Sequence, residues 1–99
     1  MARWVSRVDA MFHLSEREWA ERLDVLARFC AEVSIDPDRM IAQARSDRDV
    51  KNELMRRLRR FAADLHGSGS RPAHDAENVV RSFFIHNGAR VFVRPYEYA

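Results

Sequence analysis

The stretch from Asn78 to Gly88 constrains the fold of this chain most, because its pattern predicts an amphipathic helix with a marked end. At about 100° per residue, the side chains that pack gather on one side of this helix. That side is formed by Ala76, Val79, Val80, Phe83 and Asn87. Gly88 supplies the left-handed residue that commonly ends a helix. The segment therefore needs other helices to cover its apolar side.

A first companion helix is predicted to begin at a capping box, in which Ser15 accepts from the first turn and Glu18 reaches back. Its buried stripe is predicted to contain Trp19, Leu23, Leu26, Cys30 and Val33. Its outer face carries acids and arginines at helical spacing, which favours ion pairs between residues four apart. These residues are Arg17, Glu21, Asp24 and Arg28.

Two more helices are predicted in the middle of the chain. Asp36 is a cap followed by Pro37 at the first helical position, which predicts a short helix to about Ser46. The next helix is predicted to start at residues 47–49 and to keep one apolar side over five turns. That side contains Val50, Leu54, Leu58, Phe61 and Leu65, and the opposite side contains Arg48, Asn52, Arg56, Arg59 and Arg60.

The rest of the chain is a turn and two ends. Residues 66–72 hold two glycines and a proline, which predicts a loop before a fourth helix that opens at residues 72–75. Residues 1–14 are compatible with an N-terminal arm or a partial helix, and residues 89–95 with an extended segment, a short strand or an exit arm. The predicted fold is an all-α, four-helix bundle in residues 15–95, with a short extended exit segment that ends at residues 96–99.

Length and composition limit the classes of protein to which the chain can belong. Ninety-nine residues, 46% hydrophobic and 32% charged, suffice for one core but not for a catalytic domain with a deep cleft of its own. Cys30, the only cysteine, cannot form a disulfide framework or a cysteine zinc site within one chain and is predicted to be buried. No apolar run approaches a membrane span, and residues 1–14 lack a signal-peptide core, so a cytoplasmic location is expected.

Basic residues are concentrated in the second half of the chain. Residues 1–47 carry seven Arg against nine acids, whereas residues 48–99 carry ten Lys and Arg against six acids. The polar faces of the third and fourth predicted helices offer Arg, Asn, His and Ser, which can contact phosphates and base edges. Ile85 on the second of these faces fits either a thymine methyl group or a protein interface.

Enzymatic chemistry has little support in the sequence. The four histidines have no metal-ligand spacing, and no Gly-rich phosphate loop is present. Ser82 has no base partner recognisable in the sequence, and Asp36 and Asp38 are explained by helix capping. We therefore expect no active site, no metal and no cofactor in these residues.

Residues 15–95 resemble the N-terminal core-binding domain of tyrosine recombinases, the SAM-like domain of phage integrases. The most specific part of the resemblance is Arg81-Ser82-Phe83-Phe84 followed by His86-Asn87-Gly88. The segments 26–30, 36–38 and 58–61 and the Gly-Ser turn before Pro72 follow the same order of helices. This sequence has Pro72-Ala73-His74-Asp75 where the family carries a Ser or Thr cap, so His74 or Asp75 is expected to take the capping or phosphate role.

The resemblance implies an orthogonal bundle that clamps double-stranded DNA opposite a C-terminal catalytic domain of the same polypeptide, with other recombinase protomers as further partners. The family's Arg, Lys, His-x-x-Arg and Tyr belong to the catalytic domain, so this chain is not expected to be an enzyme by itself. Tyr96 and Tyr98 do not match the nucleophile. The expected phosphate contacts are Arg56, Arg59, Arg60, Arg71 and Arg81, and the expected contacts to groove edges are His74, Asn78 and Ser82.

Two other functions are compatible with the same sequence. An all-helical protein-interaction module would dock a partner on the face around Ile85 and use its arginines for solubility. A helix-turn-helix regulator is disfavoured by the predicted turn at residues 67–72, which is longer than the tight turn of that motif.

Overall fold

The computed structural model describes residues 2–91, which form five helices and no strand. The helices are α1 (Ala2–Phe12), α2 (Glu16–Val33), α3 (Pro37–Ser46), α4 (Arg48–His66) and α5 (Arg71–His86). The all-α prediction is confirmed. The bundle has five helices instead of four, because the first segment folds as α1. Residues 92–95 and the exit segment 96–99 lie outside the described part of the chain.

Local sequence signals set the beginnings of the helices. The capping box is present: Ser15 Oγ accepts from the backbone N–H of Glu18 at 3.1 Å, and the Glu18 carboxylate accepts from the N–H of Ser15 at 3.2 Å. Asp36 caps α3, which has proline in its first turn, and Asp47 caps α4. These three helix starts are therefore determined by residues within one turn of them.

The start of α5 differs from the prediction. Ser70 is its cap and accepts from the N–H of Ala73 at 3.2 Å, so the expectation that His74 or Asp75 caps this helix is wrong, while a phosphate contact by either residue stays a prediction. The helix begins at Arg71, one residue before Pro72, because the hydroxyl of Ser70 is in place to cap its first turn. The connection from α4 consequently contains only residues 67–70, in which Gly67 and Gly69 adopt φ of +90° and +76°.

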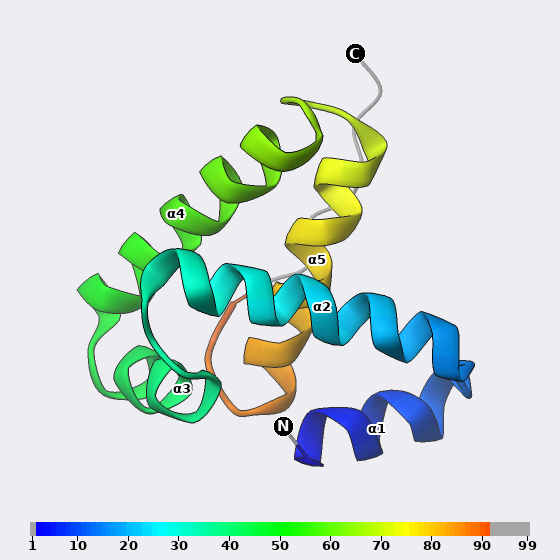
Figure 1. Ribbon diagram of the computed structural model, residues 1–99. Coiled ribbons are helices and arrows are strands. Elements are labelled where there is room, and N and C mark those ends of the chain that lie inside the picture. Colours follow the sequence, from blue (N-terminus) through cyan, green and yellow to red (C-terminus); the bar gives the residue numbers. More distant parts are fainter. Residues whose placement is uncertain (1, 92–99) are drawn as a thin grey trace.

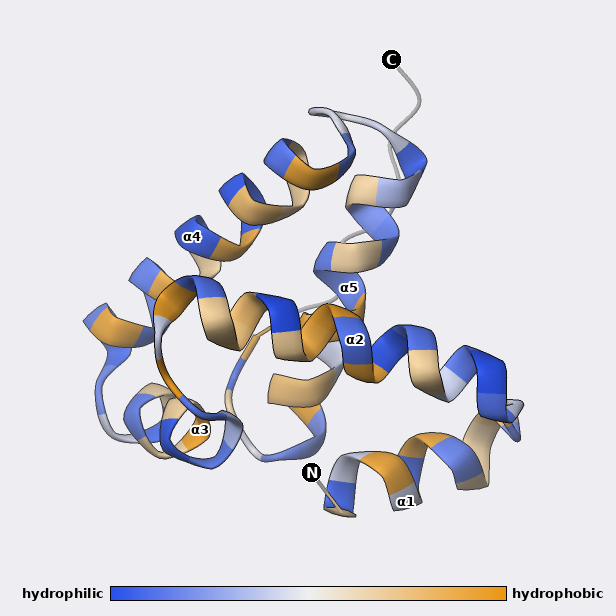
Figure 2. Ribbon diagram, in the orientation of Figure 1, coloured by the Kyte–Doolittle hydropathy of each residue, from blue (hydrophilic) through white to orange (hydrophobic). Residues whose placement is uncertain are grey.

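α5 contacts three of the other four described helices (Figure 1). α4 and α5 are antiparallel neighbours joined by the short turn, and α2 crosses both. α3 packs beside the first half of α4, and α1 packs on α5. Apolar residues recur along each helix between hydrophilic ones, as an amphipathic bundle requires (Figure 2). Because α5 contacts α1, α2 and α4, three neighbours limit how much of its surface is exposed.

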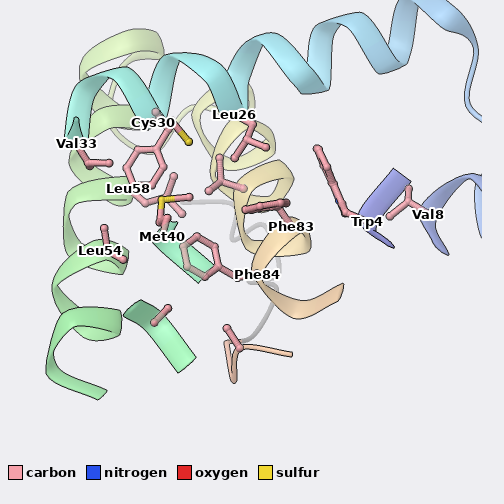
Figure 3. Packing of buried hydrophobic residues seen from close by; sticks show 14 residues of the cluster. Trp4, Val8, Leu26, Cys30, Val33, Met40, Leu54, Leu58, Phe83 and Phe84 are labelled. Carbon is pink, nitrogen blue, oxygen red and sulfur yellow. The ribbon is translucent and has the colours of Figure 1, made fainter. Parts of the chain in front are cut away.

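The core extends from α1 to α4 (Figure 3). Trp4 is fully buried, and its ring meets those of Trp19 and Phe83 edge to face, with centroids 5.4 and 5.5 Å apart. Leu58 and Val80 of the predicted stripes are fully buried, and so are Phe29 and Phe84, which lie outside those stripes, and Met40 of α3. Leu65, predicted to be buried, is instead exposed near the end of α4. Cys30 is buried as predicted.

Candidate nucleic-acid interface

The outer face of α4 carries the largest group of exposed arginines on any one described helix. Arg48, Arg56, Arg57, Arg59 and Arg60 are all exposed. They recur between the apolar residues that pack inward, so the same periodicity that builds the core brings the arginines to the surface (Figure 2). The predicted separation of this helix into an apolar and a basic side is confirmed for Leu54 and Leu58 against Arg56, Arg59 and Arg60.

The arginines of α4 differ in their partners. Arg56 Nε donates to Glu53 Oε2 at 3.0 Å, and this contact lowers the pKa of the Glu53 carboxyl. Arg57 donates to the backbone carbonyl of Glu32 in α2 at 3.3 Å. Arg59 and Arg60 have no hydrogen bond or ion pair with any described residue. Their charges are consequently available to an external anion.

The helices also differ in net charge. α4 has six Lys and Arg against three acids, a net charge of +3. α2 has three Arg against five acids, a net charge of −2, and α5 has two Arg against two acids. The predicted surface ion pairs of α2 are present, since Arg17 and Arg28 lie 3.4 and 2.9 Å from the carboxylates of Glu21 and Asp24. Attraction for a polyanion is therefore concentrated on α4.

The side of α4 that borders α5 is free of acids. Ala62 of α4 packs with Ala73 and Ala76 of α5, which identifies the ridge facing that helix. At 100° per residue, Arg48, Asn52 and Arg59 follow one another just outside this ridge, whereas Glu53 and Asp64 fall on the opposite side of the helix, next to Arg60. The basic strip thus runs along the boundary between α4 and α5.

The first turns of α5 place two of the expected site residues next to each other. His74 Nε2 and Asn78 Nδ2 are 3.0 Å apart, and both side chains are half-buried. Arg71 is exposed and its Nε donates to Asp75 Oδ1 at 3.2 Å. An exposed pair of this kind is weak, so phosphate can compete with Asp75 for the guanidinium.

Farther along α5, the predicted outward face is partly covered. Arg81 Nη2 lies 2.9 Å from Glu77 Oε1, and the two side chains are only 12% and 8% exposed. Ser82 Oγ accepts from the indole N–H of Trp4 at 3.1 Å, because α1 packs on this side of α5. The expectation that Arg81 and Ser82 lie on an open polar face is therefore wrong.

One signal in the sequence could have identified the Arg81 contact. Glu77 precedes Arg81 by four residues, the spacing at which opposite charges meet on a helix. No comparable signal marks the contact between Trp4 and Ser82, which joins residues 78 positions apart. Such a contact depends on tertiary packing and cannot be inferred from local patterns.

Other groups with reactive or ligating potential are dispersed. No group of three His, Cys, Asp or Glu side chains comes together within residues 2–91. Burial raises the pKa of the Cys30 thiol to about 11, which keeps it protonated and a poor nucleophile. His86 has a buried Nδ1 without a hydrogen-bond partner, and burial together with Arg7 lowers its pKa.

An open hollow of about 370 Å³ lies beside the start of α5. Val25 and Val79 contribute apolar surface to it, and its polar lining consists of Glu18, Glu21, Arg22, His66 and Asp75. Three carboxylates stand against one arginine, so this hollow differs in charge from the basic strip on α4. None of the helices within residues 2–91 combines the length and apolarity needed to cross a membrane.

Comparison with known proteins adds no assignment to this geometry. No protein-family model matches the chain, and no curated protein or solved structure matches it significantly.

Proposed function

We propose that this chain is a DNA-binding module of the kind found as the core-binding domain of tyrosine recombinases. In this proposal the module has the SAM-like arrangement of helices and binds duplex DNA through its phosphate backbone. Strand cleavage belongs to a separate catalytic domain. The resemblance of residues 15–95 to that family supports the proposal, as does the all-α fold.

The observation that carries the proposal is the pair Arg59 and Arg60. Both are exposed on a helix of net charge +3, and neither forms a hydrogen bond or an ion pair within residues 2–91, although the charge of Arg60 contributes to lowering the pKa of Glu53. An arginine without an internal partner loses no existing ion pair when it contacts a phosphate, and its guanidinium matches the phosphate oxygens with two parallel hydrogen bonds. Arg56 and Arg71 extend the same contact but must first exchange a carboxylate for a phosphate.

The role of α5 in the proposal is limited to its first turns. Arg71, His74 and Asn78 lie there, next to the turn that joins α4 to α5. Arg81 and Ser82 are not proposed as DNA contacts, because both are engaged within the fold. A helix-turn-helix reading would need α5 as an open recognition helix. The four-residue turn now permits that motif, but α1 and α2 cover too much of α5 for this role.

The proposal is tested by titrating the protein into a fluorescently labelled duplex of random sequence, about 20 base pairs long, and measuring anisotropy between about 50 and 200 mM salt. The logarithm of the binding constant is expected to fall linearly with the logarithm of the salt concentration, because each phosphate contact releases counterions. Arg59→Gln together with Arg60→Gln should lower the magnitude of the salt slope by about 1.8, at about 0.9 for each contact.

The matched control is Arg17→Gln with Arg28→Gln, which removes the same charge from the acidic helix α2. Its slope should equal that of the unmodified protein. The proposal is wrong if the unmodified protein does not bind duplex DNA at low salt. It is also wrong if the control pair and the α4 pair reduce binding equally, since that result would indicate net charge alone.

A further inference from the structure

A second group of cations gathers where α5 ends. Arg45 at the end of α3 lies against Gly88, and a Cβ on that glycine would be 3.6 Å from Arg45 Nε. The ammonium of Lys51 in α4 donates to the backbone carbonyl of Arg90 at 2.9 Å. Arg48 is the first residue of α4 and lies between Arg45 and Lys51 in the sequence. We call Arg45, Arg48, Lys51 and Arg90 the end cluster; its members come from α3, α4 and the segment that follows α5.

The end cluster has little acidic compensation. Arg45, Arg48 and Arg90 are exposed, and none of their side chains forms an ion pair with a described residue. The nearest acids along the chain are Asp47 and Asp49. The Asp47 carboxylate accepts from the N–H groups of Asp49 and Val50 as the cap of α4, while Asp49 lies in the first turn of that helix. Four cations against two acids leave this end of the bundle positive.

A structural role accounts for only part of the end cluster. Cations are stabilising near a helix C-terminus, where backbone carbonyls have no intrahelical partner. Lys51 binds the carbonyl of Arg90, four residues after the end of α5, and Arg45 lies beside Gly88, two residues after that end. The exposed side chains of Arg48 and Arg90 have no such contact, so the stability of the fold does not explain them.

We propose that Arg45, Arg48 and Arg90 form a second phosphate contact, so that the module holds the backbone of duplex DNA at two places. This inference rests on the proposed function and adds a site to it. Twelve residues of α4 separate Arg48 from Arg60, which is about 18 Å at 1.5 Å per residue. On a duplex that rises 3.4 Å per base pair, the two contacts are about five base pairs apart. Arg48 and Arg59 lie on the same side of α4, so one duplex can reach both groups.

The test uses the same labelled duplex and the full chain. Arg45→Gln with Arg90→Gln is compared with Arg59→Gln/Arg60→Gln and with the α2 control Arg17→Gln/Arg28→Gln, each pair removing two positive charges. The end-cluster pair should lower the salt slope by about 1.8, and the combination of four substitutions by about 3.6, because separate phosphate contacts add. Arg48→Gln with Arg90→Gln is the second variant, should the first fail to keep its helical circular dichroism.

The outcomes separate this inference from the proposed function. An end-cluster variant that binds with the unmodified slope, while Arg59→Gln/Arg60→Gln loses slope, overturns the second contact and leaves the α4 contact standing. Loss of slope in the end-cluster variant and in the α2 control alike also overturns it. Absence of binding by the unmodified protein overturns both.

Discussion

Glu77 is the one charged side chain that is buried among the described residues, and its carboxylate is held by Arg81 one turn later in α5. Removing one member of a buried pair leaves the other without compensation, so Glu77→Ala is expected to lower the free energy of unfolding by about 3 kcal/mol. Urea denaturation followed by circular dichroism measures this loss. Glu21→Ala breaks the exposed pair with Arg17 and should cost about 0.5 kcal/mol.

The double variant Glu77→Leu/Arg81→Met checks the reason for that loss. Because it replaces both charges with apolar groups of similar volume, it should recover most of the stability lost by Glu77→Ala. Equal losses in the Glu77→Ala and Glu21→Ala variants would contradict a buried pair.

His86 is expected to make the stability of the protein depend on pH. Burial, with a smaller effect of Arg7, lowers the pKa of His86 in the folded state, so the unfolded chain binds this proton more readily. By linkage, the contribution of His86 is complete above its unfolded pKa of about 6.5 and is lost as the pH falls through its lower folded pKa. Urea midpoints measured from pH 7.5 to 5 should therefore fall more steeply for the unmodified protein than for His86→Gln. Parallel pH profiles for the two proteins would rule this out.

At the scale of a single helix, two substitutions test whether Ser70 or Asp75 caps α5. Ser70 Oγ accepts from the N–H of Ala73, so Ser70→Ala should cost about 1 kcal/mol of stability. Asp75 lies in the second turn and forms only an exposed pair with Arg71, so Asp75→Ala should cost about 0.5 kcal/mol or less. Thermal unfolding of both variants ranks them, and a larger loss for Asp75→Ala would contradict the capping role of Ser70.

The sequence predicts an element well where the determining residues lie within one turn. The capping box at Ser15, the Asp36-Pro37 start of α3 and the left-handed Gly88, with φ of +83°, are all of this kind. The sequence does not identify the cap of α5, because Ser70 lies in a run of glycine and serine whose pattern also fits a longer loop. Local signals thus predict which segments form helices more accurately than they predict where a loop ends.

The residues of the candidate interface also differ in whether local sequence signals predict their exposure. The exposed arginines of α4 follow from a 3.6-residue period, so the sequence alone was sufficient to find them. The exposure of α5 depends on which helices pack against it, whereas the pattern of residues 1–14 predicts an arm or a partial helix. For that reason the sequence predicts an open face at Ser82, although Trp4 donates a hydrogen bond to it from the opposite end of the described chain.

For the molecule as a whole, α1 has the contacts of a core element. Trp4 is fully buried between Trp19 of α2 and Phe83 of α5, and Val8 joins the same core. The chain thus closes on itself, its first helix resting on its last. If α1 were a peripheral arm, it would detach from a bundle that remained folded. If it belongs to the core, its loss should weaken all five helices together.

Trp4→Ala distinguishes these cases. Deleting a buried tryptophan leaves a large cavity and is expected to cost about 4 kcal/mol, a large part of the stability of about 5–15 kcal/mol typical of a domain. The helical signal at 222 nm and the fluorescence of Trp19 should then disappear in one coincident transition at a lower urea concentration. Met11→Ala, on the same helix but 63% exposed, is the control and should leave the midpoint nearly unchanged. Retention of the unmodified midpoint by Trp4→Ala would show that α2 to α5 are stable without the α1 contact, because the buried indole would then contribute nothing to the transition.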